Sequence, residues 1–199
     1  MNPVSETEVA GPRQGQPSAF LPGFGVFAWR VTALHMLTYF LAGIVAMSVF
    51  HYETLFETQA LSCFMRPVKS VWVAFGPGLQ VFRGLLFAVV LYPIADTILS
   101  RRRGWLILWG LFLGLATLGT VGPSPGSFEG MAYTKVPLIT HLTGLPEVVT
   151  QTLLFSLGLV AWCRRPARWM NVLGIIAVVL IVLMSGLGAL AAAGLLPKA

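Results

Sequence analysis

The sequence has few charged residues and few of the residues that reactive sites use. Charged residues make up 10% of the 199 residues, and there are only 7 acidic residues, 3 histidines and 2 cysteines. No glycine-rich phosphate loop, His-Glu-x-x-His zinc motif or Gly-x-Ser-x-Gly nucleophile elbow occurs. The chain therefore lacks the usual signatures of nucleotide-dependent, zinc-dependent and serine-hydrolase chemistry.

Long apolar runs are what the sequence has instead. Hydrophobic residues make up 56% of the chain, which is outside the range of soluble globular domains. A bilayer core about 30 Å thick needs roughly 20 apolar residues per helix. Five runs meet or nearly meet this length and predict an all-α integral membrane protein, a bundle of five transmembrane helices. We expect these helices at residues 31–50, 79–99, 105–121, 147–163 and 172–196.

The runs leave room for one domain and a tail. Residues 1–22 are rich in Pro, Gly, Ser and Gln and predict a disordered cytoplasmic tail. Residues 23–199 predict a single membrane domain. No basic segment adjoins an apolar stretch near the first residue, so we expect the first helix to be an uncleaved signal-anchor.

Eight of the thirteen basic residues fall on three alternate segments of the chain. By the positive-inside rule these segments are cytoplasmic, with the amino terminus inside and the carboxyl terminus outside. This placement accounts for the net charge of +6 without a nucleic-acid partner. We expect a bacterial inner membrane. The residues are Arg13 and Arg30, then Arg101, Arg102 and Arg103, then Arg164, Arg165 and Arg168.

Two partly ordered loops are expected on the outer face, at residues 51–78 and 122–146. In the first, Phe56 and Phe64 are interspersed with acidic residues, which is typical of a short amphipathic helix at the membrane surface. We expect Pro67 to end this helix and the Gly-Pro-Gly of residues 76–78 to turn the chain into the second transmembrane helix.

Arg83 and Glu147 form the sharpest pair of opposite charges. Each is expected about one turn inside its helix, at a similar depth in the outer half of the membrane. Because a charge near hydrocarbon is costly, we expect them to meet directly or through one water or ligand. The pair either grips a polar or zwitterionic ligand or locks two helices together. The full candidate outer pocket is Arg83, Glu147, Glu129, His141, Tyr133, Lys135, His51 and Glu53.

A second candidate pair lies on the inner side. His35 follows Arg30 by five residues and Asp96 precedes Arg101 by five, so matched depth is expected. Such a pair relays protons or tunes a transport gate. The alternative is an ordinary buried hydrogen bond. The outer histidines and glutamates lack zinc spacing, so we expect no metal, cofactor or catalytic residue.

The leading functional hypothesis is a non-enzymatic membrane module. It binds a small polar or amphipathic ligand, a lipid headgroup or a partner subunit at the outer face, as a transport component or accessory subunit. The alternative is a membrane-embedded hydrolase or transferase acting on a lipid at that surface. Beyond the bilayer, partner subunits are expected to pack on the small residues of the fifth helix. These are Gly174, Gly186, Gly188, Ala189, Ala192 and Gly194.

The predicted orientation is testable by cysteine labelling of intact cells. We expect a membrane-impermeant thiol reagent to modify a cysteine introduced at Ser124 but not one introduced at Gly104, because the two positions lie on opposite sides. Replacing Cys63 and Cys163 first removes the native background. Labelling of the Gly104 cysteine but not of the Ser124 cysteine would show that the topology is the reverse of the predicted one.

Overall fold

The described part of the computed structural model is built from helices alone. It comprises residues 20–118 and 122–196, so the predicted tail lies almost wholly outside it. The helices are α1 (Phe24–Val49), α2 (Tyr52–Phe56), α3 (Val71–Ser100), α4 (Gly104–Thr117), α5 (Phe128–Tyr133), α6 (Leu138–Thr143), α7 (Leu145–Arg164) and α8 (Arg168–Ala192).

Four segments are long and apolar enough to cross a membrane. They are α1, α3, the combined α6–α7 segment and α8, while α4 is apolar but only 14 residues long. This confirms an all-α membrane protein with several membrane-spanning helices. The predicted count of five helices is roughly met, with α4 as the short member.

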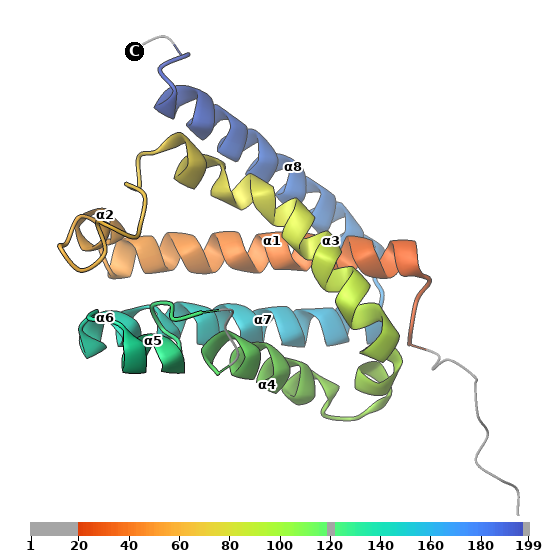
Figure 1. Cartoon of the computed structure of the whole chain (residues 1–199). Coiled ribbons are helices and arrows are strands. Elements are labelled where there is room, and N and C mark those ends of the chain that lie inside the picture. The colour runs from red at the N-terminus through yellow and green to blue at the C-terminus, as the bar shows by residue number, and fades with distance from the viewer. Residues whose placement is uncertain (1–19, 119–121, 197–199) are drawn as a thin grey trace, which may run out of the picture.

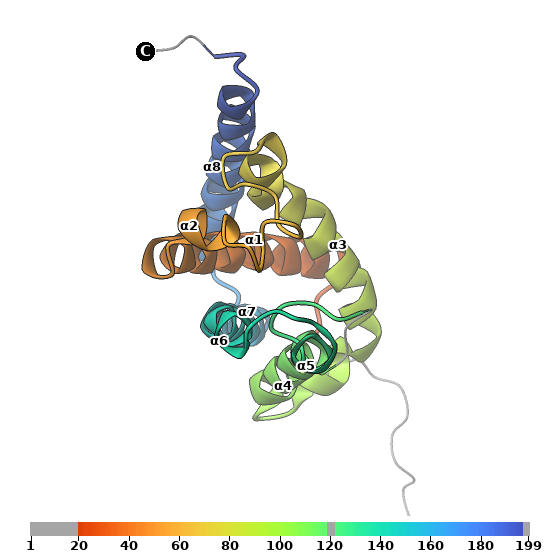
Figure 2. The ribbon, with the colours of Figure 1, turned by 60° about the vertical axis from the view of Figure 1, so that its left-hand side comes forward.

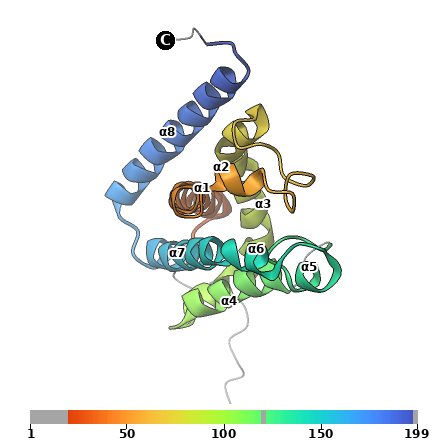
Figure 3. The same ribbon diagram turned by 90° about the vertical axis from the view of Figure 1, so that its left-hand side faces the viewer.

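Helix α1 lies at the centre of the bundle. In Figures 1 and 3, α7 runs antiparallel beside α1, α4 covers the far side of α7, and α3 and α8 rise away from α1 at an angle. Figure 2 shows the same divergence from a second direction. Helices α2, α5 and α6 gather at one end, which we call the loop face. The α3–α4 and α7–α8 turns, with their arginines, mark the opposite end, which we call the arginine end.

Two helices begin seven and eight residues earlier than the sequence predicts. Helix α1 starts at Phe24 because Arg30 does not mark a boundary: its side chain is 7% exposed and its Cζ lies 6.0 Å from the centre of the Trp162 ring. Helix α3 starts at Val71, where the Ser70 hydroxyl accepts the N–H of Val73 at 3.4 Å as an N-cap.

The predicted turn at residues 76–78 is therefore wrong. These residues lie inside α3, because Pro77 removes only one backbone donor and the N-cap has already set the helix direction. Arg83 consequently lies twelve residues, or about 18 Å, beyond the start of α3 rather than about one turn.

Other helix ends also differ from expectation. Helix α4 stops at Thr117, and α8 stops at Ala192, where Gly194 adopts a left-handed φ of 72° that closes the helix end. The amphipathic helix of the first loop is limited to α2, and turns follow it. The loop is thus ordered mainly by turns.

Several small residues of α8 pack within the chain. A Cβ added to Gly174 would lie 3.0 Å from the Trp162 ring, and one added to Gly188 would lie 3.6 Å from Ala74. Gly186, by contrast, has nothing within 4 Å. Two residues of the stripe predicted for partner subunits, Gly174 and Gly188, therefore serve contacts inside the bundle, while Gly186 and Gly194 face open space.

Close approach of α1 and α3 fixes the register between them. A Cβ added to Gly84 would lie 2.7 Å from the Thr32 Cα, so the two backbones touch at this point. The contact aligns the residues that follow Thr32 in α1 with those that precede Gly84 in α3. His35 and Gln80 are brought together in this way.

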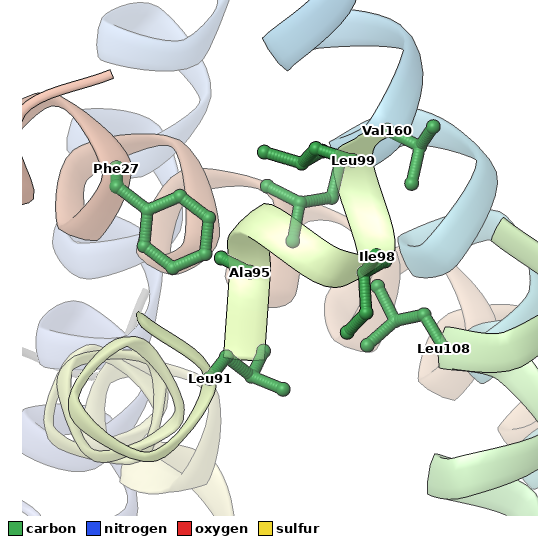
Figure 4. Close-up of a pocket in the computed structure, with 8 residues that line it drawn as sticks. Phe27, Leu91, Ala95, Ile98, Leu99, Leu108 and Val160 are labelled. Carbon is green, nitrogen blue, oxygen red and sulfur yellow. The ribbon is translucent and has the colours of Figure 1, made fainter. Parts of the chain in front are cut away.

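The apolar core near the arginine end is packed densely. Side chains from α1, α3, α4 and α7 enclose only about 10 Å³ there, roughly the space of one water (Figure 4). Arg164 fastens the same end, because its Nε donates to the Leu99 carbonyl at 3.1 Å and its Nη1 to the Arg102 carbonyl at 3.3 Å. A cation at the end of α3 also complements the helix dipole.

Packing at the arginine end makes Gly104 a poor position for the cysteine-labelling experiment. A Cβ at Gly104 would lie 1.8 Å from the carbonyl oxygen of Ile98, so a cysteine there would disturb the α3–α4 turn. Arg102 is exposed in the same turn and is the better position for the reagent.

Candidate functional site

A polar cavity of about 310 Å³ lies between α1, α3, α4 and α7. Three phenylalanines form its apolar wall, and Phe112 meets Phe87 and Phe155 edge to face, with ring centres 5.0 and 5.3 Å apart. The polar residues at the cavity are His35, Tyr39, Arg83, Glu147, Gln151 and Thr152. A concave, mostly apolar space with a few polar groups is typical of a small-molecule site.

Arg83 supplies the positive charge at the cavity. Its Cζ lies 5.4 Å from the centre of the Phe87 ring, one turn along α3. No ion pair or hydrogen bond joins its guanidinium to another residue of the described ranges. The interaction with the ring compensates only part of the cost of a cation in a membrane-spanning helix.

Glu147 supplies the negative charge from the first turn of α7, where the helix dipole favours a carboxylate. Its Oε2 accepts a hydrogen bond from the Tyr52 hydroxyl, which ties α2 to α7. Burial, reinforced by this bond to a carboxylate, raises the pKa of Tyr52 well above its ordinary value. Tyr52 therefore stays protonated and remains a donor at neutral pH.

Arg83 and Glu147 share the cavity without a direct ion pair. No pair within 4.0 Å joins them in the described structure, although Tyr39 lies within electrostatic reach of both. A bridge through water or ligand stays a prediction. The shared cavity is the space in which such a bridge would form.

His35 joins the cavity and does not meet Asp96. Its Nε2 lies 3.0 Å from the Gln80 Oε1. The Gln80 amide donates to the Gly76 carbonyl at 3.1 Å, so its oxygen faces His35 and the histidine Nε2 donates. Asp96 is sixteen residues beyond Gln80, about 24 Å along α3. The predicted inner pair fails because the register between α1 and α3 differs from the one assumed.

His141 holds the second loop together and is completely buried. Its Nδ1 accepts the N–H of Gly126 at 3.0 Å, and its Nε2 lies 3.3 Å from the Thr134 Oγ1. Because Nδ1 is an acceptor, Nε2 carries the proton and donates to Thr134. The side chain thus joins α5 to α6 and is occupied by structural bonds.

The other predicted outer residues lie away from the cavity. Glu53 forms an ion pair with Lys69, and this hydrogen bond raises the pKa of Lys69. His51 is exposed, with a left-handed φ of 49°, just before α2. Tyr133 and Lys135 are exposed, and Glu129 is half-buried in α5. The predicted outer pocket is therefore divided, with only Arg83 and Glu147 of its members at the cavity.

Some cavity residues were not identified from the sequence. Tyr39 follows His35 by four positions, and Gln151 follows Glu147 by four. Residues at this spacing lie on one face of a helix, so a polar pair inside an apolar run marks a polar stripe. The spacing of four is the sequence feature that indicates these two cavity residues. Within the described ranges, no group of three or more His, Cys, Asp and Glu side chains is placed to hold a metal ion.

We predict that the Tyr52–Glu147 hydrogen bond stabilises the fold. Replacing Tyr52 by Phe removes a bond to a charged acceptor, which contributes about 1.5 kcal/mol or more. We expect a loss of that order in unfolding titrations from mixed detergent and SDS micelles. In a Glu147→Gln background the same substitution should cost less than half as much.

Tyr133→Phe is the matched control. That side chain is 77% exposed, so its free energy of unfolding should change by no more than about 0.5 kcal/mol. Equal losses from Tyr52→Phe in both backgrounds would show that the hydroxyl does not act through Glu147.

Comparisons with protein families, curated proteins and solved structures gave no match for this chain. The functional inference therefore rests on the chemistry of the cavity. The cavity is lined by one guanidinium and one carboxylate, and both belong to helices that are long and apolar enough to span a membrane.

Proposed function

We propose that this chain is a non-enzymatic, multi-pass membrane protein that binds a small polar or amphipathic ligand in the cavity between Arg83 and Glu147. The observation that carries the proposal is the guanidinium of Arg83. It lies beside a cavity of about 310 Å³ and has no counter-charge within 4.0 Å in the described ranges. A cation in hydrocarbon costs roughly 2.5–3.5 kcal/mol on insertion scales, and a bound polar group offsets that cost.

The size of the cavity supports binding of a small ligand. Its volume is at the lower end of the range typical of small-ligand pockets. The apolar core around Phe27, Leu99 and Leu108 encloses only about 10 Å³, whereas a separate hollow of about 260 Å³ lies beside Arg164 and Arg165. The cavity at Arg83 and Glu147 is the proposed resting place of the ligand because, of these described spaces, only it holds both charges.

The loop face is proposed to lie outside the cell, with the amino terminus inside. The arginines at the opposite end support this orientation through the positive-inside rule. A bacterial inner membrane remains the proposed location. Within it, a binding module of this size acts as a transport component or as an accessory subunit.

The binding role is favoured over the enzyme alternative by the state of His141. One form of the enzyme alternative uses His141 as the base for a nucleophile at the loop face, and His141 is completely buried. Its two ring nitrogens bond to Gly126 and Thr134, and Nε2 donates its proton. The histidine is thus engaged in holding the loop.

We predict that Arg83→Gln removes a co-purifying ligand. Native mass spectrometry of the protein released from mild detergent should show a bound small molecule or lipid on the wild type. On the variant it should be reduced at least tenfold, because the neutral amide loses the charge that holds the polar group.

Arg66→Gln is the control, since Arg66 is exposed and lies over the Trp72 ring, away from the cavity. This variant should keep the ligand. Equal occupancy of wild type and Arg83→Gln, with both folded, would contradict the proposed site.

A further inference from the structure

The hollow of about 260 Å³ beside Arg164 and Arg165 lies between α4 and α7 at the arginine end, and we call it the α4–α7 hollow. Apolar side chains from both helices form most of its wall, and the two arginines line it where α7 stops. It shares no residue with the cavity at Arg83 and Glu147. The residues that line it are Trp105, Leu157, Val160, Ala161, Arg164 and Arg165.

Apolar surface and charge follow one another along α7 in this hollow. Leu157 and Arg164 are seven residues apart, which is about 10 Å along a helix. Arg164 is the last residue of α7 and Arg165 follows it, so the charges lie at the helix end and the apolar wall lies toward the middle of the bundle. Leu157 is 39% exposed and Ala161 is also exposed. A lipid in the leaflet at the arginine end carries its headgroup and its chains in the same order.

Arg164 fixes the position of the neighbouring α3–α4 turn. Its guanidinium donates to the carbonyls of Leu99 and Arg102 at 3.1 and 3.3 Å, and a third bond goes to the Arg101 carbonyl. These bonds hold the turn at the end of α7. The side chains of Arg101, Arg102 and Arg103 are exposed there. The turn therefore adds positive charge at the end of α7 that bears the hollow.

No carboxylate of the described ranges lines the α4–α7 hollow. The acidic residue of α3 is Asp96, one turn before the helix end, and it is not among the lining residues. No ion pair or hydrogen bond joins the Arg165 side chain to another described residue. Trp105 suits this position, because tryptophan is enriched at the level of lipid headgroups. Basic side chains beside a lipid surface attract anionic headgroups.

We infer that an anionic phospholipid of the leaflet at the arginine end binds in the α4–α7 hollow, with its phosphate at Arg165 and an acyl chain against Leu157 and Ala161. Phosphate suits a guanidinium because two of its oxygens accept parallel hydrogen bonds. The charge of Arg164, held in place by three carbonyls, lies beside the same phosphate. This second site goes beyond the proposed function and does not depend on it.

The experiment titrates the full chain in mild detergent with two lipids and counts the first bound lipid by native mass spectrometry. Palmitoyl-oleoyl phosphatidylglycerol is the anionic probe, and phosphatidylcholine with the same chains is the zwitterionic one. We expect phosphatidylglycerol to bind at least tenfold more tightly, because choline neutralises the charge that the arginines recognise. Glycerophosphoglycerol, which has the headgroup without the chains, should bind at least tenfold more weakly than phosphatidylglycerol.

Two matched variants locate the headgroup. Arg165→Gln should weaken phosphatidylglycerol binding about fivefold, the contribution of one basic residue near a membrane surface, and leave phosphatidylcholine binding unchanged. Arg168 is exposed in the same α7–α8 turn but does not line the hollow, so Arg168→Gln should change binding less than about twofold. The effect of Arg165→Gln should be the same in an Arg83→Gln background, because the two sites share no residue.

A second pair of variants locates the chain. Ala161 is exposed and lines the hollow, so Ala161→Trp should fill it and weaken phosphatidylglycerol binding about tenfold. Thr97 is exposed on α3 near the same end but does not line the hollow, so Thr97→Trp should not change binding.

Each part of the inference has a result that would overturn it. Equal affinity for the two lipids would overturn the anionic headgroup. Equal losses from Arg165→Gln and Arg168→Gln would show that the charge of the whole arginine end, and not the hollow, attracts the lipid. A silent Ala161→Trp, or headgroup binding as tight as lipid binding, would overturn the acyl chain. None of these results bears on the ligand of the cavity at Arg83, which the Arg83→Gln comparison tests separately.

Discussion

The cost of placing a charge inside a membrane is the constraint on which this site depends. Arg83 lies about 18 Å into α3, well away from the ends of a membrane-spanning helix. Its guanidinium faces the Phe87 ring and a cavity, and no described carboxylate lies within 4.0 Å. A cation in this position must be compensated by water, by lipid phosphate or by a ligand. The exposed Arg83 side chain lines the cavity, so the cavity is where we propose that a ligand supplies this compensation.

Contacts on several sides hold the helices that line the cavity. Contact between α1 and α3 at Gly84 sets the register that brings His35 and Gln80 together beside Arg83. Tyr52 holds Glu147 from the loop face. At the arginine end, Arg164 bonds to the carbonyls that end α3, and the apolar core excludes further space. A cavity with polar groups, held between well-packed helix contacts, suits binding of a ligand better than transport of a ligand through the bundle.

The sequence was sufficient for the class of fold but not for its register. Apolar runs identified the membrane helices because their length reflects bilayer thickness. Helix starts were misplaced where a charge or a proline was taken as a boundary, since Arg30 is covered by Trp162 and Pro77 lies within α3. The pairing of His35 with Asp96 failed in part for the same reason, because the depth of His35 was counted from Arg30, which is not a boundary.

The candidate site was predicted in part. Arg83 and Glu147 stood out because isolated charges in apolar helices are rare. Tyr39 and Gln151 did not, because polar neutral residues also occur on ordinary helix surfaces and only the register shows which of them face inward. The loop residue His141 attracted attention by its chemistry. Its burial and its two structural bonds depend on how α5 and α6 pack, which local sequence does not reveal.

An experimental density map of the protein in lipid nanodiscs, at a resolution that shows side chains, tests the central claim most directly. The account predicts density between Arg83 and Glu147 that does not belong to the protein. A closed cavity, with the Arg83 guanidinium in direct contact with the Glu147 carboxylate and no room between them, would contradict it. The pair would then be a structural lock between two helices.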